Sequence, residues 1–321
     1  MNPFFARTLS RAVTTTVFAL ALGGCGSSSD PAPPPSPPPA CNAVASATLD
    51  VTYKSVGVPA QDALLTLDVY APPAATTCSR LPVVVWVHGG GWHTGDKGNQ
   101  MVNKVPLFTG QGYLLVSINY RLSPTPVANP DPGRLLHPVH TQDVASAVAW
   151  LRSNIARWGG DGQKIALLGH SAGAHLAALV GTDGAFLAAH GLPLNALRCV
   201  GAYDSEGLDI PTAMLTAGPT QSGLFINAFG TDAALWTQAS PITHVSAGKG
   251  IAPIQLACRG AADRVAICTS MRDKLLAAGV TATVIDASSM THEEVNERIG
   301  APGDTVMTPP VMSFLSSTCF R

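Results

Sequence analysis

The chain has 321 residues, of which 46% are hydrophobic and only 12% are charged, and its formal net charge at pH 7 is −1. A chain of this length buries one large hydrophobic core, and its near-zero charge offers no basic surface for nucleic acid. The composition therefore indicates a globular protein with one main domain and argues against a nucleic-acid-binding protein.

The first 24 residues have the pattern of an export signal. Two arginines precede an apolar run over residues 12–22, which is too short to span a bilayer. Leu22-Gly23-Gly24-Cys25 resembles a bacterial lipobox, in which the cysteine is lipidated and becomes the first residue. We expect residues 1–24 to be a lipoprotein signal peptide and Cys25 the lipidation site. The alternative is a plain signal cleaved after residues 19–21.

A proline-rich segment follows the lipobox. Residues 30–40 cannot pack a core, and such a composition stiffens into polyproline II at about 3.1 Å per residue. We expect residues 25–40 to tether a domain over residues 41–321 to a membrane of the bacterial cell envelope, either in the periplasm or at the outer membrane. Free secretion is the alternative.

Six cysteines remain after Cys25: Cys41, Cys78, Cys199, Cys258, Cys268 and Cys319. An even number in an exported chain predicts up to three disulfides, for which 15 pairings exist. We expect Cys41–Cys78 to pin the N-terminal strands and Cys268–Cys319 to tie down the C-terminal helix. No two cysteines have a metal-ligand spacing such as C-x₂-C, so no metal site is expected.

A buried strand over residues 83–87 leads into His88-Gly89-Gly90-Gly91-Trp92. Consecutive glycines expose backbone N–H groups that no side chain shields, which suits a loop that stabilises a negatively charged oxygen. We expect Gly90 and Gly91 to be oxyanion donors. A flexible glycine turn is the alternative.

Two segments follow this loop. Residues 125–140 are rich in proline and carry Arg134, His137 and His140, so they form either a cap over a pocket or a long surface loop. Apolar residues at helical spacing then predict a core-facing helix over residues 143–155.

The pattern Gly169-His170-Ser171-Ala172-Gly173 lies between a short apolar strand, residues 165–168, and an Ala/Leu-rich helix, residues 175–180. A serine on so sharp a turn requires glycine two positions to either side, so that strand and helix approach without a Cβ clash. The turn predicts Ser171 as a nucleophile and the N–H of Ala172 as a third oxyanion donor. An ordinary strand-to-helix turn is the alternative.

A base for Ser171 is expected on a loop after the last strand. His292 follows a β-branched strand over residues 281–285 and a polar loop, whereas His190 and His244 follow no strand and His175 lies in the helix after the serine. We expect His292 to be the general base.

Two acids compete as the partner of His292. Asp263 follows a strand over residues 253–258, and Asp204 follows the preceding strand over residues 198–202. Either carboxylate would accept the proton-bearing nitrogen of His292 and fix its tautomer. We expect Asp263 to be the acid, with Asp204 as the rival.

Five motifs, in order, resemble those of the α/β-hydrolases of the carboxylesterase group, in particular bacterial feruloyl-esterase-like and arylformamidase-like enzymes. The motifs are His88–Trp92 with Gly95-Asp96-Lys97, Asn119–Ser123, Gly159-Gly160-Asp161, Gly169–Leu176, and Thr291–Asn296. The resemblance covers residues 64–315. It implies a mostly parallel sheet of about eight strands flanked by helices, with Ser171, Asp263 and His292 as the triad and Gly90, Gly91 and Ala172 as oxyanion donors.

Together with the export signal, the resemblance implies an exported serine carboxylic ester hydrolase of the feruloyl- or acetyl-esterase type, without a cofactor, acting on a small or polysaccharide-linked ester. We expect a monomer, with Trp92 and Tyr120 as candidate pocket residues that could equally be packing residues. An arylformamidase-type amide hydrolase would use the same triad, but export argues against it. The remaining alternative is a non-catalytic surface-binding protein on this scaffold, which is disfavoured because the triad and the glycine loop are present.

Overall fold

The computed structural model describes residues 41–124 and 134–321 of the chain. The predicted signal peptide (1–24), the tether (25–40) with Cys25, and residues 125–133 of the predicted cap lie outside the described residues.

Eight strands form one sheet in the spatial order β1-β2-β4-β3-β5-β6-β7-β8. They are β1 (Ala47–Thr52), β2 (Thr66–Tyr70), β3 (Leu81–Val87), β4 (Leu114–Ile118), β5 (Gly160–His170), β6 (Cys199–Tyr203), β7 (Ile254–Cys258) and β8 (Ala282–Asp286). Only β2 runs against its neighbours, since it pairs antiparallel with both β1 and β4 while all other pairs are parallel. The mostly parallel sheet of about eight strands implied by the family resemblance is confirmed.

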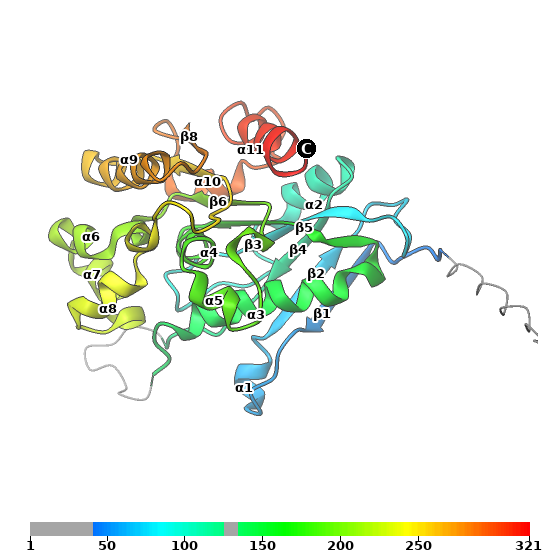
Figure 1. Ribbon diagram of the computed structural model, residues 1–321, viewed down its shortest axis with the longest axis horizontal. Helices are drawn as coiled ribbons and strands as arrows, with labels where there is room; N and C mark the ends of the chain where they lie inside the picture. The colour runs from blue at the N-terminus through cyan, green and yellow to red at the C-terminus, as the bar shows by residue number, and fades with distance from the viewer. Residues whose placement is uncertain (1–40, 125–133) are drawn as a thin grey trace, which may run out of the picture. The chain divides into compact units, whose positions relative to one another are not determined.

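Both faces of the sheet are covered, which explains why β3 is a continuous apolar run. Val83, Val85 and Val87 belong to one core cluster, and Val84 and Trp86 belong to another on the opposite face. Helices α3 and α4 pack in the first cluster, whereas α2 and α11 pack in the second (Figure 1).

The helices are α1 (Pro59–Asp62), α2 (Met101–Gly110), α3 (Val139–Asn154), α4 (Ala172–Thr182), α5 (Gly184–Ala188), α6 (Ile210–Thr216), α7 (Pro219–Phe229), α8 (Ala233–Ala239), α9 (Ala262–Ala277), α10 (His292–Glu297) and α11 (Thr308–Phe314). Short 3₁₀ segments η1 to η4 cover Ile155–Trp158, Leu194–Ala196, Glu206–Asp209 and Pro241–His244, and the π-helical segment η5 covers Leu315–Cys319. Among the described residues, no helix has the length and apolar character needed to cross a membrane.

The parallel strands place several loops at one edge of the sheet. Strands β3, β5, β6 and β7 end in the same direction, so the residues that follow them converge there. These are the glycine loop after Val87, Ser171 after β5, Asp204 after β6 and Arg259 after β7. The candidate site is therefore assembled from residues far apart in the sequence.

Three disulfides join the six cysteines: Cys41–Cys78, Cys199–Cys319 and Cys258–Cys268. The expected pair Cys41–Cys78 is present, but the expected Cys268–Cys319 pair is wrong. Cys268 is buried on the α9 face of the sheet and Cys319 on the α11 face, so the sheet separates them. Each therefore pairs with the end of a strand that it packs against.

The disulfides are expected to differ in their contribution to stability, because a longer closed loop restricts the unfolded chain more. The Cys199–Cys319 bond has a sequence separation of 120 and the Cys258–Cys268 bond one of 10. Chain entropy predicts losses of about 5 and about 3 kcal/mol of unfolding free energy for the respective double alanine variants. Urea denaturation of Cys199→Ala/Cys319→Ala and Cys258→Ala/Cys268→Ala measures both. An equal or smaller loss for the first variant would contradict this expectation.

Candidate active site

Ser171 occupies a strained turn between β5 and α4. Its backbone has φ 56° and ψ −122°, a conformation that L-residues rarely adopt. A Cβ on Gly169 would lie 2.4 Å from the carbonyl oxygen of Gly173, and a Cβ on Gly173 would lie 2.2 Å from that of Val87. The two glycines therefore permit the close packing that the G-x-S-x-G pattern predicts.

His292 and Asp204 complete a hydrogen-bonded chain that begins at this serine. The Oγ of Ser171 lies 2.9 Å from Nε2 of His292, and Nδ1 of His292 lies 2.5 Å from Oδ2 of Asp204. His292 is the first residue of α10, which a capping box between Thr291 and Glu294 holds in place. The arrangement has the order of contacts of a serine–histidine–acid triad.

Asp204 stands where the sequence analysis placed Asp263, so that assignment is corrected. Helix α9 begins at Ala262, and Asp263 therefore lies in its exposed first turn. There its carboxylate accepts hydrogen bonds from the Arg264 N–H and the Thr216 side chain. Asp204 instead leaves β6 at a positive φ of 59°, and its side chain lies beside His292.

The carboxylate of Asp204 is nearly inaccessible, with 3% of its side chain exposed. Burial by itself would raise its pKa, but the hydrogen bond from His292 and the charge of Arg264 outweigh burial and lower the pKa to about 2. The group is thus a carboxylate, as the partner of a histidine base must be.

The glycine loop after β3 lies beside Ser171. Within the described ranges, the N–H groups of Gly90, Gly91 and Ala172 donate to no acceptor, and all three residues line the same pocket as Ser171. A Cβ on Gly90, whose φ is 114°, would lie 2.1 Å from the carbonyl oxygen of Thr94. The predicted oxyanion donors are therefore brought together by a turn that excludes any larger residue at Gly90.

The pocket above Ser171 has a volume of about 760 Å³. Many of its lining side chains are polar or charged, among them Asn99, Gln100, Glu206, Gln221, Glu293 and Asn296. It accommodates a polar ligand group better than a long apolar chain.

The two aromatic pocket candidates are mainly packing residues. Trp92 contributes to the pocket lining, but its ring is buried against Phe225 and Phe229 and its Nε1 donates to Nδ1 of His175. Tyr120 is fully buried and does not line the pocket; its hydroxyl donates to the carbonyl of His88 at 3.1 Å. Tyr120 therefore supports the glycine loop from behind and is not a substrate contact.

The described part of the predicted cap, residues 134–140, does not reach this pocket. His137 and His140 are buried, and Nε2 of His140 lies 3.0 Å from the hydroxyl of Ser123. Arg134 donates to the carbonyl oxygens of Ile226 and Asn227. The bonds of Arg134 fasten the segment to α7.

Sequence reasoning missed His170, the residue before the nucleophile. Burial lowers the pKa of His170 to about 3, so its ring is neutral. Its Nε2 lies 2.9 Å from the carbonyl oxygen of His292, which can only accept, so His170 donates there. The only sequence feature that could have indicated a role for His170 is its position inside the serine motif, at the end of β5.

One group of potential metal ligands occurs among the described residues: His170, Asp204 and His292. Each of them already has a hydrogen-bond partner in the site, and Asp204 is also paired with two arginines. A cation at this position would meet the positive charge of both arginines, so the donor set fits a proton-transfer chain better than a metal.

The depressed pKa of Asp204 predicts a stability loss in acid. Because its folded-state pKa of about 2 lies below the ordinary 3.8, the carboxylate stabilises the fold above pH 3.8, and this contribution is lost as the pH falls through 2. The loss is about 2 kcal/mol. Unfolding free energies measured between pH 5 and pH 2 should decline more steeply for the wild type than for Asp204→Asn. Equal slopes would contradict the expectation.

A family model described as BD-FAE matches residues 67–194. Esterase LipQ of Mycobacterium tuberculosis is 41% identical over 113 residues, which are 35% of this chain and 25% of LipQ. Lipase 2 of Diutina rugosa is 31% identical over 213 residues, covering 63% of this chain and 34% of the lipase. The chain spans about a quarter of the length of the first curated relatives it matches.

Solved structures share the fold along most of the chain. A truncated form of a carbohydrate esterase from gut microbiota superimposes with a TM-score of 0.67 and 20% identity, covering 88% of this chain and 99% of that one. Esterase 2 of Thermogutta terrifontis gives a TM-score of 0.60 and 23% identity, covering 78% and 85%. The chain thus has the α/β-hydrolase fold, and the part of its sequence that holds the glycine loop and the serine turn is similar to the BD-FAE family model.

Proposed function

We propose that the protein is an exported serine carboxylic ester hydrolase that acts through an acyl-enzyme on Ser171. The observation that carries the proposal is the chain of contacts from the Ser171 hydroxyl through His292 to Asp204, next to three free N–H groups. The esterase names of the similar relatives support it.

In this mechanism Nε2 of His292 takes the proton of Ser171 as its Oγ attacks the ester carbonyl. The negative charge on the carbonyl oxygen is stabilised by the N–H groups of Gly90, Gly91 and Ala172. His292 then gives its proton to the leaving alcohol. Water, deprotonated by His292, attacks the acyl-enzyme. The bond to Oγ then breaks, the carboxylic acid leaves, and His292 returns the proton to Ser171. Asp204 remains ionised and orients the imidazole throughout.

The polar lining of the pocket favours an ester whose acyl or alcohol part carries hydroxyl groups, such as a feruloyl or acetyl ester of a sugar. One solved structure with the same fold is titled as a carbohydrate esterase, which agrees with this choice. The export signal and proline-rich tether would place the enzyme in the cell envelope, where it would encounter sugar esters from outside the cytoplasm.

An amide hydrolase is the second candidate. A probable N-octanoylanthranilate hydrolase of Rhodococcus erythropolis is 37% identical over 123 residues, and that name describes removal of an N-acyl group. The same triad and oxyanion donors would serve that reaction. Turnover of p-nitrophenyl acetate compared with p-nitroacetanilide separates the two, because the esterase proposal requires the ester to be strongly preferred.

Removal of the triad groups should abolish most of the activity toward p-nitrophenyl acetate. We expect Ser171→Ala to lower kcat by about 10⁴- to 10⁶-fold and Asp204→Asn by about 10⁴-fold. Asp263→Asn is the matched control and should stay within about twofold of wild type, since its side chain is exposed. An inactive Asp263→Asn with an active Asp204→Asn would overturn the acid assignment. Equal slow turnover by wild type and Ser171→Ala would overturn the enzyme proposal.

Lipidation at Cys25 is testable in a bacterial host grown with a labelled palmitate analogue. The wild type should carry the label and fractionate with membranes, and Cys25→Ser should do neither, because the lipobox thiol is the acceptor. Cys41→Ser serves as the control that retains the label. Labelling that survives Cys25→Ser would refute the lipoprotein assignment.

A further inference from the structure

The carboxylate of Asp204 contacts two arginines in addition to His292. Its Oδ1 lies 2.5 Å from Nη2 of Arg264, and its Oδ2 is paired with Nε of Arg259. Both arginines line the pocket above Ser171, and their side chains are less than one-fifth exposed. The orientation of the triad carboxylate is therefore set by two guanidinium groups, which sequence reasoning did not anticipate.

Arg264 also bridges to a second acid. Its Nη1 is paired with Oε1 of Glu206, which lies in η3 just after β6. Two carboxylates, Asp204 and Glu206, and two guanidinium groups, Arg259 and Arg264, thus form a cluster whose formal charges cancel. The planar fork of an arginine suits such a bridge because it presents donors in fixed directions to two carboxylates at once.

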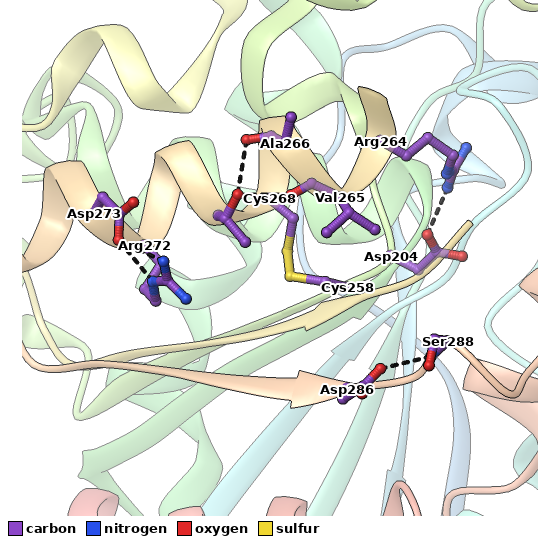
Figure 2. Close-up of a disulfide and its surroundings, with 11 residues drawn as sticks. Asp204, Cys258, Arg264, Val265, Ala266, Cys268, Arg272, Asp273, Asp286 and Ser288 are labelled. Atoms are coloured by element: carbon purple, nitrogen blue, oxygen red, sulfur yellow. Dashed lines mark hydrogen bonds and ion pairs between the residues drawn. A yellow bond between two sulfur atoms is a disulfide. The ribbon is translucent and has the colours of Figure 1, made fainter. Parts of the chain in front are cut away.

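The Cys258–Cys268 disulfide joins the two backbone segments that carry the arginines. Cys258 ends β7 and directly precedes Arg259, and Cys268 follows Arg264 by one turn of α9. Figure 2 shows the bond running from the strand end to α9, with Arg264 directed toward Asp204. Within the described residues, no side chain caps the N-terminus of α9, whose N-cap residue is Ala261, and the disulfide provides a covalent restraint near this end of the helix.

We propose that Arg264 is a positioning residue for Asp204 and that the Cys258–Cys268 disulfide holds the start of α9 so that this contact persists. The inference rests on the proposed function, since it assigns a role within the same triad. Without the bridge, the carboxylate turns more freely and aligns His292 with Ser171 less often. Turnover falls as a result, while substrate binding changes little, because the altered contact is with the nearly inaccessible carboxylate of Asp204.

The charge of Arg264 has a second consequence. The titratable and charged groups that face the His292–Asp204 pair come from five elements or their adjoining loops: His170 from β5, Glu206 from η3, Arg259 from the end of β7, Arg264 from α9 and Glu293 from α10. Removal of one positive charge from this set makes a proton easier to add to the pair. The acid limb of the kcat/KM profile should therefore move to higher pH, which a loss of stability alone would not cause.

The test compares Arg264→Gln, Arg264→Lys and the control Arg272→Gln. Arg272 lies on the same helix and, among the residues that the structure describes, pairs with the exposed Asp273. Arg264→Gln should lower kcat on p-nitrophenyl acetate by about 10- to 100-fold with little change in KM, and shift the acid limb upward. Arg264→Lys keeps the charge but not the fork, so kcat should fall while the acid limb stays in place. Arg272→Gln should match wild type.

A raised KM with unchanged kcat in Arg264→Gln would mean that Arg264 binds substrate and would overturn the positioning role. Unchanged kcat, KM and pH profile would overturn it too. If the wild type itself turns over no faster than Ser171→Ala, the proposed function is wrong. If the wild type is active and Arg264→Gln is equally active, only the positioning role of Arg264 is wrong.

The disulfide is tested by a double-mutant cycle. Cys258→Ser/Cys268→Ser should lower kcat by about tenfold in the wild-type background and have little further effect in Arg264→Gln, because both changes loosen the same contact. Cys41→Ser/Cys78→Ser, which removes a disulfide outside the pocket, should leave kcat unchanged. Circular dichroism verifies that each variant is folded at the assay temperature. An equal loss of kcat in both backgrounds would show that the disulfide acts independently of Arg264.

Discussion

The close approach between the start of α4 and the end of β3 is the constraint on which the site depends. A Cβ on Gly173 would lie 2.2 Å from the carbonyl oxygen of Val87, so only glycine permits this contact. Because α4 begins so near to β3, the chain must turn at Ser171 with a positive φ. The same packing places the glycine loop beside the serine: a Cβ on Gly89 would lie 3.0 Å from that of Ser171. The positions of the predicted nucleophile and of the predicted oxyanion donors are thus set by one contact.

The second constraint is electrostatic. Asp204 is buried, and an unpaired carboxylate in that position would be costly. Its oxygens are instead shared among His292, Arg259 and Arg264, and Glu206 balances the remaining positive charge. Ion pairing keeps the acid ionised and directed at the imidazole. Stability and the orientation of the triad therefore depend on the same cluster.

Local pattern picked out Ser171, His292 and the glycine loop, which the structure brings together, but it did not pick out Asp204, the acid that lies beside His292. Both Asp204 and Asp263 follow parallel strands that end at one edge of the sheet, so sequence position did not separate them. Two local conformations distinguish the two acids. Asp204 leaves its strand at a φ of 59° and lies beside His292, whereas α9 begins at Ala262 and leaves Asp263 in an exposed first turn. Neither the positive φ of Asp204 nor the start of α9 has a sequence pattern as distinct as the serine motif.

The sequence by itself determined the serine turn, the glycine loop and the strands that lead into them, because these depend on residue patterns within short segments, whereas the eight-stranded sheet was implied by the family resemblance. Tertiary structure alone decided which acid meets His292 and how Cys268 and Cys319 pair. The contact between His292 and Asp204 joins residues 88 positions apart, and the two cysteines lie on opposite faces of the sheet. These pairings depend on which distant side chains are brought together by packing, and a local sequence pattern does not specify that.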